Sequence, residues 1–249
     1  MEKHHRVLEP EAMESLEEVI AYDRLTMKYL QILHNGFIET ILNGTPERGC
    51  FLEVGSGSGR ISIGIAKQNK SVEITGIDLS ENMITVARKN AIEEKVSDFI
   101  DFQLASATEI PFPDHSFDAV YCHNMLHHIP NIDLAVKEML RVLKPSGGFF
   151  IRDLVRQSPL VTALHVNVFG LTYNSLMKKE YRDSIKASLS WEEIDTLFAS
   201  LELPGKKLRK YFLTHFGIEK QAQNRRTQKI EVSTPAYIKF MKNMYVAPR

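Results

Sequence analysis

The sequence predicts an α/β protein, in which one sheet of mostly parallel strands carries helices on both faces. From Glu47 to Leu154, short apolar segments alternate with segments of helical periodicity, and such alternation requires parallel strands joined by right-handed crossovers. Residues 50–60 read as a buried strand, a glycine-rich turn and the start of a helix. The 249 residues are 43% hydrophobic and 25% charged, which is enough apolar material for one domain with a sizeable core and an appendage.

The glycine-rich stretch Phe51-Leu-Glu-Val-Gly-Ser-Gly-Ser-Gly-Arg60 is the strongest local signal. Gly55, Gly57 and Gly59 allow a sharp turn and a close approach to a ligand, because none of them carries a Cβ. A dinucleotide-binding fingerprint has two residues between its second and third glycine, whereas here only Ser58 intervenes. The tighter turn favours a nucleoside without phosphates. A single glycine-rich loop is also compatible with an ordinary tight turn.

Two acids accompany this turn. Glu53 precedes it within the strand, and Asp78 follows 25 positions later at the end of the next predicted strand, Val72–Asp78. The carboxylate of Asp78 can accept hydrogen bonds from both hydroxyls of a ribose and would repel a 2′-phosphate. Glu53 suits a cationic ligand better than a polyanion. Together they predict a nucleoside with a positive charge.

The chain also carries a series of short motifs in a fixed order and spacing. They are Leu52-Glu-Val-Gly-Ser-Gly-Ser-Gly, Gly76-Ile-Asp-Leu-Ser, Phe117-Asp-Ala-Val, Leu126-His-His-Ile and Leu143-Lys-Pro-Ser-Gly-Gly-Phe. This series resembles that of class I S-adenosylmethionine-dependent methyltransferases, and in particular the type 11 group that includes ubiquinone and menaquinone C-methyltransferases. The resemblance covers residues 47–154. It implies a Rossmann-like, seven-stranded sheet that is mostly parallel, with the last strand antiparallel.

The resemblance also implies the cofactor and its contacts. The cofactor would be S-adenosyl-L-methionine and the product S-adenosyl-L-homocysteine. Ser106 stands where the family commonly has an acid that binds the adenine amino group, so this contact departs from the family pattern, although a serine hydroxyl can also accept that hydrogen bond. The residues expected to bind the cofactor are Glu53, Gly55, Ser56, Gly57, Gly59, Asp78, Leu79, Met83, Ala105, Ser106, Ala107, Cys122 and His123.

Outside the sheet, two regions are expected to be helical. Residues 1–46 form an N-terminal helical cap, with an amphipathic helix over 11–33 that a break near Asp23 would divide, and with a helical pattern that continues until Asn43-Gly-Thr-Pro46. Residues 155–189 form an insertion of one or two helices, the expected cover over the substrate. The cofactor-binding core is residues 47–154.

The remaining elements follow from caps and stop signals. Ser80 caps one helix, and Ser190-Trp-Glu-Glu193 is a capping box that opens another. Residues 190–249 end the sheet and form a basic C-terminal tail, with a short helix over 237–245. The expected bounds are helices at 80–94, 132–143 and 190–201, strands at 99–104, 117–122 and 148–154, a helix stop at 144–148, and an antiparallel pair at 208–215 and 216–220.

Candidate catalytic residues follow the fourth strand. Methyl transfer from a sulfonium needs placement of the acceptor and exclusion of water, and it needs a base only if the acceptor begins neutral. The order of candidates for that base is His127, then His123. The alternative is that these histidines only hydrogen-bond the fold. A helical segment would also bring His123 and His127 together for a metal, but no third ligand is evident and no metal is expected.

Four residues are candidates for contact with the methyl acceptor: Tyr22, Arg152, Tyr173 and Tyr181. An arginine would suit an acceptor with a carboxylate or phosphate. The tyrosines are equally compatible with ordinary packing positions of amphipathic helices.

Composition excludes several other classes. With only Cys50 and Cys122, the chain has neither a disulfide framework nor a clustered thiolate site. No apolar run approaches the ~20 residues that span a bilayer, and the N-terminus lacks the apolar segment of a secretory signal, so a cytoplasmic protein without a membrane span is expected. The net charge is zero, although residues 206–249 are basic.

The sequence therefore predicts a methyltransferase that acts on a small-molecule acceptor. The basic tail leaves open an RNA or protein methyltransferase, but no aromatic and basic interleaving marks a nucleic-acid platform, so nucleic acid is not the expected partner. A non-catalytic module that only binds the cofactor has the same motifs. A homodimer is compatible with the sequence.

Overall fold

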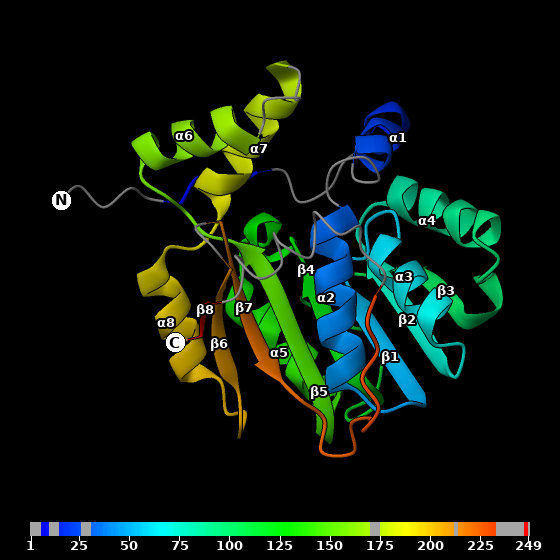
Figure 1. Cartoon of the computed structure of the whole chain (residues 1–249). Helices are drawn as coiled ribbons and strands as arrows, with labels where there is room; N and C mark the ends of the chain where they lie inside the picture. The colour runs from blue at the N-terminus through cyan, green and yellow to red at the C-terminus, as the bar shows by residue number, and fades with distance from the viewer. Residues whose placement is uncertain are drawn as a thin grey trace.

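The computed structural model describes residues 6–9, 15–25, 31–169, 175–211, 214–232 and 247–248. One sheet with the strand order β3-β2-β1-β4-β5-β7-β6-β8 runs through the molecule, and helices cover both of its faces (Figure 1). Strands β1 to β5 pair in parallel, whereas β7 is antiparallel to both β5 and β6. The predicted seven-stranded, mostly parallel sheet is confirmed. The short β8 adds an eighth strand beside β6.

The elements lie close to their expected positions. The strands are β1 (Gly49–Val54), β2 (Val72–Asp78), β3 (Ile100–Leu104), β4 (Phe117–His123), β5 (Leu143–Leu154), β6 (Lys207–Tyr211), β7 (His215–Lys220) and β8 (Ala247–Pro248). The α-helices are α1 (Leu16–Leu25), α2 (Gln31–Gly44), α3 (Arg60–Gln68), α4 (Glu81–Glu93), α5 (Ile132–Val142), α6 (Pro159–Phe169), α7 (Ser175–Ala187) and α8 (Trp191–Ser200). Two 3₁₀ turns, η2 (Ser97–Phe99) and η3 (Leu126–His128), complete the described elements.

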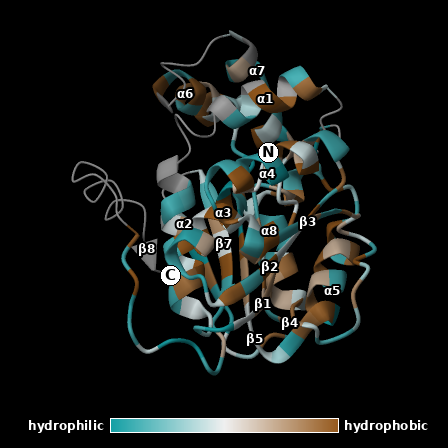
Figure 2. Ribbon diagram, turned by 90° about the vertical axis from the view of Figure 1, so that its right-hand side faces the viewer, coloured by the Kyte–Doolittle hydropathy of each residue, from teal (hydrophilic) through white to brown (hydrophobic). Residues whose placement is uncertain are grey.

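The core consists of two apolar layers, one on each face of the sheet. Alternate residues of β1 supply them, because successive strand side chains point to opposite faces. Phe51 joins the layer under α2, α3 and α4, whereas Leu52 and Val54 join the layer under α5 and α8. Figure 2 shows hydrophobic residues concentrated in the central strands and on the inner sides of the helices. Burial of both faces explains why these strands read as continuous apolar runs.

Helices α1, α6 and α7 lie beyond the carboxyl ends of the parallel strands, at the top of Figure 1. The expected helix over residues 11–33 is represented by α1 and the start of α2, and the insertion contains two helices, α6 and α7. The predicted C-terminal helix over 237–245 falls outside the described residues. No helix in the described part of the chain is long and apolar enough to cross a membrane.

One boundary differs from the expectation. Residues 144–148 were expected to stop the helix and the next strand to begin at 148, but α5 ends at Val142 and β5 begins at Leu143. The register shifts between Phe117 and Ala119 of β4, so the extra residues of β5 bulge from the sheet. The ammonium group of Lys220 donates to the carbonyl oxygens of Pro145 (2.9 Å) and Gly147 (2.6 Å). These bonds satisfy backbone acceptors that strand pairing leaves over.

Candidate functional site

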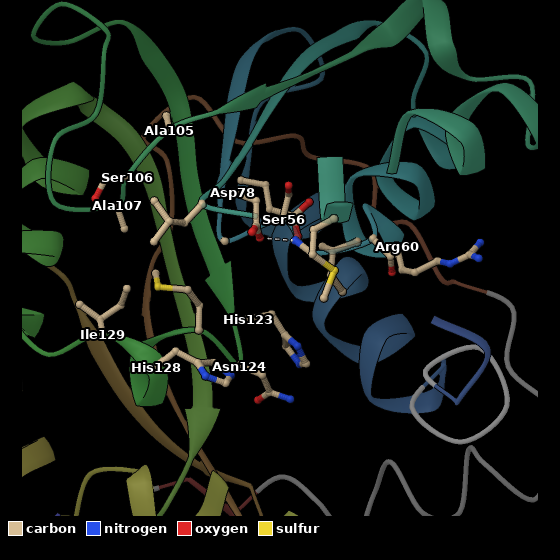
Figure 3. A pocket seen from close by; sticks show the side chains of 18 of the residues that line it. Ser56, Arg60, Asp78, Ala105, Ser106, Ala107, His123, Asn124, His128 and Ile129 are labelled. Carbon is tan, nitrogen blue, oxygen red and sulfur yellow. Dashed lines mark hydrogen bonds between the residues drawn. The ribbon is translucent and has the colours of Figure 1, made fainter. Parts of the chain in front are cut away.

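A cleft lies at the carboxyl ends of β1, β2 and β4, the edge where ligands of open α/β sheets bind. Figure 3 shows Ser56 beside Asp78, while His123, Asn124 and His128 lie together at the end of β4. The residues that line the cleft are Tyr22, His34, Glu53, Gly55, Ser56, Gly57, Ser58, Arg60, Ile61, Asp78, Leu79, Met83, Ala105, Ser106, Ala107, Thr108, His123, Asn124, Met125, His128 and Ile129.

The glycine-rich turn forms one wall of the cleft. The amide groups of Gly55 and Ser56 both donate to the carbonyl oxygen of Ile77 (2.9 Å each), which fastens the turn to β2. Gly55 has a φ of +69°, and a Cβ there would meet Cγ of Met125 at 2.3 Å. Gly57 has a φ of +51°, and a Cβ there would project into open space. Glycine at position 57 therefore keeps open a part of the cleft that any side chain would fill.

Asp78 holds this turn from the end of β2. Its Oδ2 accepts a hydrogen bond from the amide of Gly57 (2.8 Å), and its Oδ1 accepts one from the amide of Ser80 (2.9 Å). Burial raises the pKa of Asp78, and the amide bonds oppose that effect. Since each carboxylate oxygen can accept more than one hydrogen bond, Asp78 still has acceptor capacity toward the cleft.

Glu53 is a buried acid at the base of the cleft, with only 2% of its surface exposed. Its Oε2 accepts hydrogen bonds from the amide (3.1 Å) and the hydroxyl of Ser62, and the hydroxyl of Tyr121 lies 3.0 Å from Ser62 Oγ. Burial raises the pKa of Glu53 to about 8, although the bonds from Ser62 lower it. Its hydrogen-bond partners within the described chain are neutral. A cation in the cleft would therefore favour the ionised form of this carboxyl group.

The end of β4 supplies polar atoms that the protein leaves unpaired. Within the described chain, His123 Nε2, Asn124 Oδ1 and Ser56 Oγ are buried and have no hydrogen-bond partner. All three residues line the cleft. A buried polar atom without a partner costs about 1–3 kcal/mol, so its persistence points to a ligand or water that satisfies it.

Two imidazoles in the cleft, those of His34 and His123, are neutral. Burial lowers the pKa of His34 to about 4, and burial together with the charges of His34 and Arg152 lowers the pKa of His123 well below its usual value. The rings of His34 and His123 meet edge to face, with their centroids 5.1 Å apart. A neutral imidazole can either donate or accept a hydrogen bond, so this wall suits an uncharged or anionic group.

The opposite end of the cleft is more apolar. Leu79 follows Asp78 and remains 46% exposed, whereas Met83 is buried. The hydroxyl of Ser106 lies 2.8 Å from Thr108 Oγ1, and Ser106 Oγ also accepts a hydrogen bond from the Thr108 amide (3.2 Å). Ser106 therefore already has partners within its own loop.

Eleven of the thirteen residues predicted to bind the cofactor line this cleft, and Gly59 and Cys122 do not. Gly59 starts α3 with a φ of +79°, and a Cβ there would meet the Phe102 ring at 2.5 Å, so its position reflects packing. Cys122 is fully buried in the core layer that includes Val120. Strand alternation sends the side chains of neighbouring residues to opposite faces, which is why His123 reaches the cleft and Cys122 does not.

The first catalytic candidate, His127, also lies outside the cleft lining. Its Nδ1 is 2.6 Å from Asp153 Oδ1, and the ring is 4% exposed. Burial would lower the pKa of His127, but the charge and hydrogen bond of Asp153 raise it overall. His123 belongs to β4 and His127 to a 3₁₀ turn, so the helical spacing on which a shared metal would depend is absent from this segment.

The four acceptor candidates are dispersed. Tyr22 lines the cleft, whereas Arg152 and Tyr181 do not, and Tyr173 falls outside the described residues. Arg152 is buried between two aromatic rings, 4.9 Å from the centroid of Phe37 and 4.0 Å from that of Tyr211. Arg152 therefore acts on the cleft through its charge, by lowering the pKa values of the nearby imidazoles.

Among the lining residues that sequence reasoning missed are His34 and Arg60. The guanidinium of Arg60 donates to both carboxylate oxygens of Asp23, from Nε (2.7 Å) and Nη2 (2.5 Å). This pair ties α1 to the start of α3 and so places Tyr22 over the cleft. No sequence pattern signals a contact between residues 37 positions apart. The extra histidine at position 34 likewise reads as an ordinary polar position of α2.

The comparisons with known proteins agree with this geometry. Residues 52–151 match the family model of a methyltransferase domain. Over 102 residues, the chain is 40% identical to a ubiquinone/menaquinone biosynthesis C-methyltransferase of Rickettsia bellii, and this alignment covers 39% of the chain and 41% of that relative. The chain thus matches well under half of the relative's length.

Two solved structures share the fold. A Methanococcus maripaludis protein proposed to be an S-adenosyl-L-methionine-dependent methyltransferase has a TM-score of 0.64 at 21% identity, covering 89% of this chain and 100% of that one. The plantazolicin methyltransferase BamL, solved with a triazolic desmethylPZN analogue and S-adenosylhomocysteine, has a TM-score of 0.62 at 22% identity, covering 77% of this chain and 71% of that one. Both likenesses show the shared fold, within which residues 52–151 match a methyltransferase domain.

Proposed function

We propose that the protein transfers a methyl group from S-adenosylmethionine to a small-molecule acceptor. The observation that carries this function is the meeting, in one cleft, of the open space at Gly57, two acids and the unpaired polar atoms at the end of β4. The relative from Rickettsia bellii is named for the methylation of ubiquinone and menaquinone precursors, and BamL was solved with a small-molecule analogue. Both names support a small acceptor.

The residues present fit the cofactor. Asp78 would hold the ribose hydroxyls through its remaining acceptor capacity, and Leu79, Met83 and the 105–107 loop would enclose the adenine. Glu53 lies among neutral hydrogen-bond partners, so it would face the cationic end of the cofactor. The sulfonium of the cofactor supplies the transferable methyl group when it is bound. The chain itself has to orient both reactants and exclude water.

His123 and Asn124 are the best candidates for contact with the acceptor. Both line the cleft, and His123 Nε2 and Asn124 Oδ1 have no partner in the described chain. His123 is neutral at physiological pH, so it can accept a hydrogen bond from a hydroxyl or donate one to an oxyanion. His127 is fastened to Asp153 instead. We therefore place His123 ahead of His127 as the group that faces the reacting atom.

Binding of S-adenosylhomocysteine tests the cofactor assignment. Calorimetry on Asp78→Ala should show affinity at least about tenfold weaker than wild type, because hydrogen bonds to a charged group each contribute roughly 1.5–3 kcal/mol. Asp101→Ala is the matched control, since Asp101 is an exposed acid on the neighbouring strand β3 and should bind as wild type does. Failure of the wild type to bind, or equal affinities in all three proteins, would overturn the assignment.

Turnover then separates an enzyme from a module that only binds the cofactor. Transfer of a labelled methyl group to a panel of phenols, quinols and amines measures it directly. Transfer that is lost in His123→Ala while S-adenosylhomocysteine still binds supports the proposed acceptor role. Binding of the cofactor without transfer to any panel member, followed by transfer to an RNA or a protein, would replace the small-molecule assignment.

A further inference from the structure

Three side chains with metal-ligating atoms meet beside the cleft. Glu9 comes from the N-terminal segment of residues 6–9, and His127 and His128 come from the turn η3. One ligand atom of each lies within 4.8 Å of the others, and Nδ1 of His128 is 3.7 Å from Glu9 Oε2. The side chain of Glu9 is 14% exposed and that of His127 only 4%. Two imidazoles and a carboxylate form a ligand set typical of zinc and related divalent transition metals.

Asp153 orients one of these ligands, the imidazole of His127. Its Oδ1 lies 2.6 Å from His127 Nδ1, and its Oδ2 accepts a hydrogen bond from the amide of Leu126 (2.6 Å), so the carboxylate is fixed by the backbone of the same turn. A proton on Nδ1 leaves the lone pair of the imidazole on Nε2. Metal-binding histidines commonly donate their other nitrogen to a carboxylate in this way, which fixes the tautomer and the orientation of the ring.

The third ligand lies against α7. Ser184 Oγ is 3.2 and 3.1 Å from the two carboxylate oxygens of Glu9 and 3.1 Å from the carbonyl oxygen of Glu180, so these acceptors share its one hydroxyl hydrogen. Nearby, the guanidinium of Arg6 donates to the carbonyl oxygens of Ala187 (2.6 Å), Leu126 (2.9 Å), His127 (3.0 Å) and Ile129 (2.9 Å). The segment is thus fastened to both η3 and α7.

The local charge also favours a cation. Glu9, Asp153 and Glu193 bring three carboxylates to this region, against the guanidinium groups of Arg6 and Arg156. The turn faces the cleft through His128, which lines it. An ion bound here would sit at the edge of the cleft and join the N-terminal segment to the loop that follows β4.

We infer that Glu9, His127 and His128 form a binding site for one divalent transition metal of the zinc class, with Asp153 as the positioning residue. The site departs from the expectation of no metal, because the third ligand is more than a hundred positions away from the histidines in sequence. It is independent of the proposed methyl transfer, since none of the three ligands is assigned to the cofactor.

Titration of untagged, chelator-treated full-length protein tests the site. Zn²⁺ is followed by calorimetry and Co²⁺ by its visible absorption, which reports coordination by nitrogen and oxygen ligands. The wild type should bind one equivalent. Glu9→Gln and His128→Ala should each lose about tenfold or more in affinity, and Asp153→Asn should lose about 10–100-fold. Zn²⁺ should also raise the melting temperature of the wild type more than that of Glu9→Gln.

Two controls identify the ligands. His115→Asn removes an imidazole whose Nδ1 is paired with the carbonyl oxygen of Leu143 and not with any residue of the cluster. This variant should bind metal as the wild type does. His4 and His5 lie just before the segment in sequence, so the double alanine variant should also retain binding. If that variant loses the metal, or if Glu9→Gln and His128→Ala bind as tightly as wild type, the assignment is wrong. Because His128 is partly exposed, its replacement keeps the test valid should Asp153→Asn fail to fold.

Binding of S-adenosylhomocysteine measured on the same samples separates this inference from the proposed function. If the wild type binds the cofactor but no metal, the metal site is contradicted and the proposed function is not. Metal binding with no cofactor binding would leave the site standing and remove the methyltransferase proposal.

Discussion

At the scale of single residues, Glu53 shows how burial sets a protonation state. An acid removed from water, with only neutral hydrogen-bond donors beside it, is costly to ionise. Burial raises the pKa of Glu53 to about 8, against the opposing effect of the Ser62 bonds. Most molecules of the free protein therefore carry a proton on Glu53 at pH 7, and a cationic ligand in the cleft would displace it.

Binding of the cofactor at pH 7 should release up to one proton per complex. Calorimetry in two buffers with different ionisation enthalpies measures this release for S-adenosylmethionine. Glu53→Gln, which cannot ionise, should release none. Glu73→Gln, which changes an exposed acid of β2, should behave as the wild type does. A heat of binding that is the same in both buffers for the wild type would show that Glu53 does not change its protonation state on binding, and would contradict this prediction.

At the scale of elements, the position of α1 depends on one bidentate ion pair. The side chains of Arg60 and Asp23 are 14% and 11% exposed, and Asn90 adds a hydrogen bond to Asp23 Oδ1 (3.3 Å) while it also donates to the carbonyl oxygen of Ser58 (2.9 Å). A nearly buried pair is costly to break from one side, because the remaining charge loses its partner. Helix α1 is thus joined to α3 and α4 by this polar network and by the apolar contact of Val19 with Met83 and Val86.

Arg60→Met should free α1 while the sheet stays intact. We expect faster amide hydrogen exchange over residues 16–25, unchanged exchange in β1 and β4, and weaker binding of S-adenosylhomocysteine, because Tyr22 would leave the cleft. Lys89→Met is the matched control, since the pair of Lys89 with Glu93 is exposed and its atoms are 3.8 Å apart. Unchanged exchange in α1 would mean that its apolar contacts are sufficient to hold it.

At the scale of the whole molecule, two sets of buried titratable groups determine how stability depends on pH, one on the acidic side and one on the basic side. Burial lowers the pKa of His34 to about 4 and that of His215 to about 3, and lowers that of His123 as well. The unfolded chain would bind protons on these histidines below about pH 6.5, whereas the native chain would not. Stability should therefore fall as the pH drops below that value.

Glu53 and His127 act in the opposite direction. The native state keeps a proton on Glu53 up to about pH 8, and the pKa of His127 is raised overall, whereas the unfolded chain has lost both protons. Stability should thus also fall as the pH rises from about 6.5 to 8. Urea unfolding of the free protein at pH 5, 6.5 and 8 should give its largest free energy at the middle value. Glu53→Gln should flatten the decline toward pH 8, and a steady rise up to pH 8 would contradict the assignment.

The sequence was sufficient for the features that depend on local pattern. The turn at Gly55–Gly57, the acid at Asp78 and the capping box at Ser190 follow from neighbouring residues, and the parallel sheet brings the strand ends to one edge without further information. The sequence could not show which of the two side chains, Cys122 or His123, faces the cleft. Strand β4 is buried on both faces and so lacks the alternation that would reveal its orientation.

Contacts between distant segments could not be predicted from the sequence either. The pair of Asp23 with Arg60, and the meeting of Glu9 with η3, depend on how α1 and the N-terminal segment cross the finished sheet. Neither carries a spacing that a reader of the sequence could detect. These are also the contacts on which the cover over the cleft and the inferred metal site depend.

The bonds of Arg6 bear on how the protein is made. The guanidinium of Arg6 donates to the carbonyl oxygen of Ala187, 181 positions further along the chain. This hydrogen bond cannot form until α7 has emerged from the ribosome. Contacts of such long separation form late, because the intervening loop must first be closed. The Rossmann-like core can therefore assemble during synthesis, while docking of the first residues is deferred to the final stages. A molecule that folds its core first would form the cleft before residues 6–9 dock onto η3 and α7.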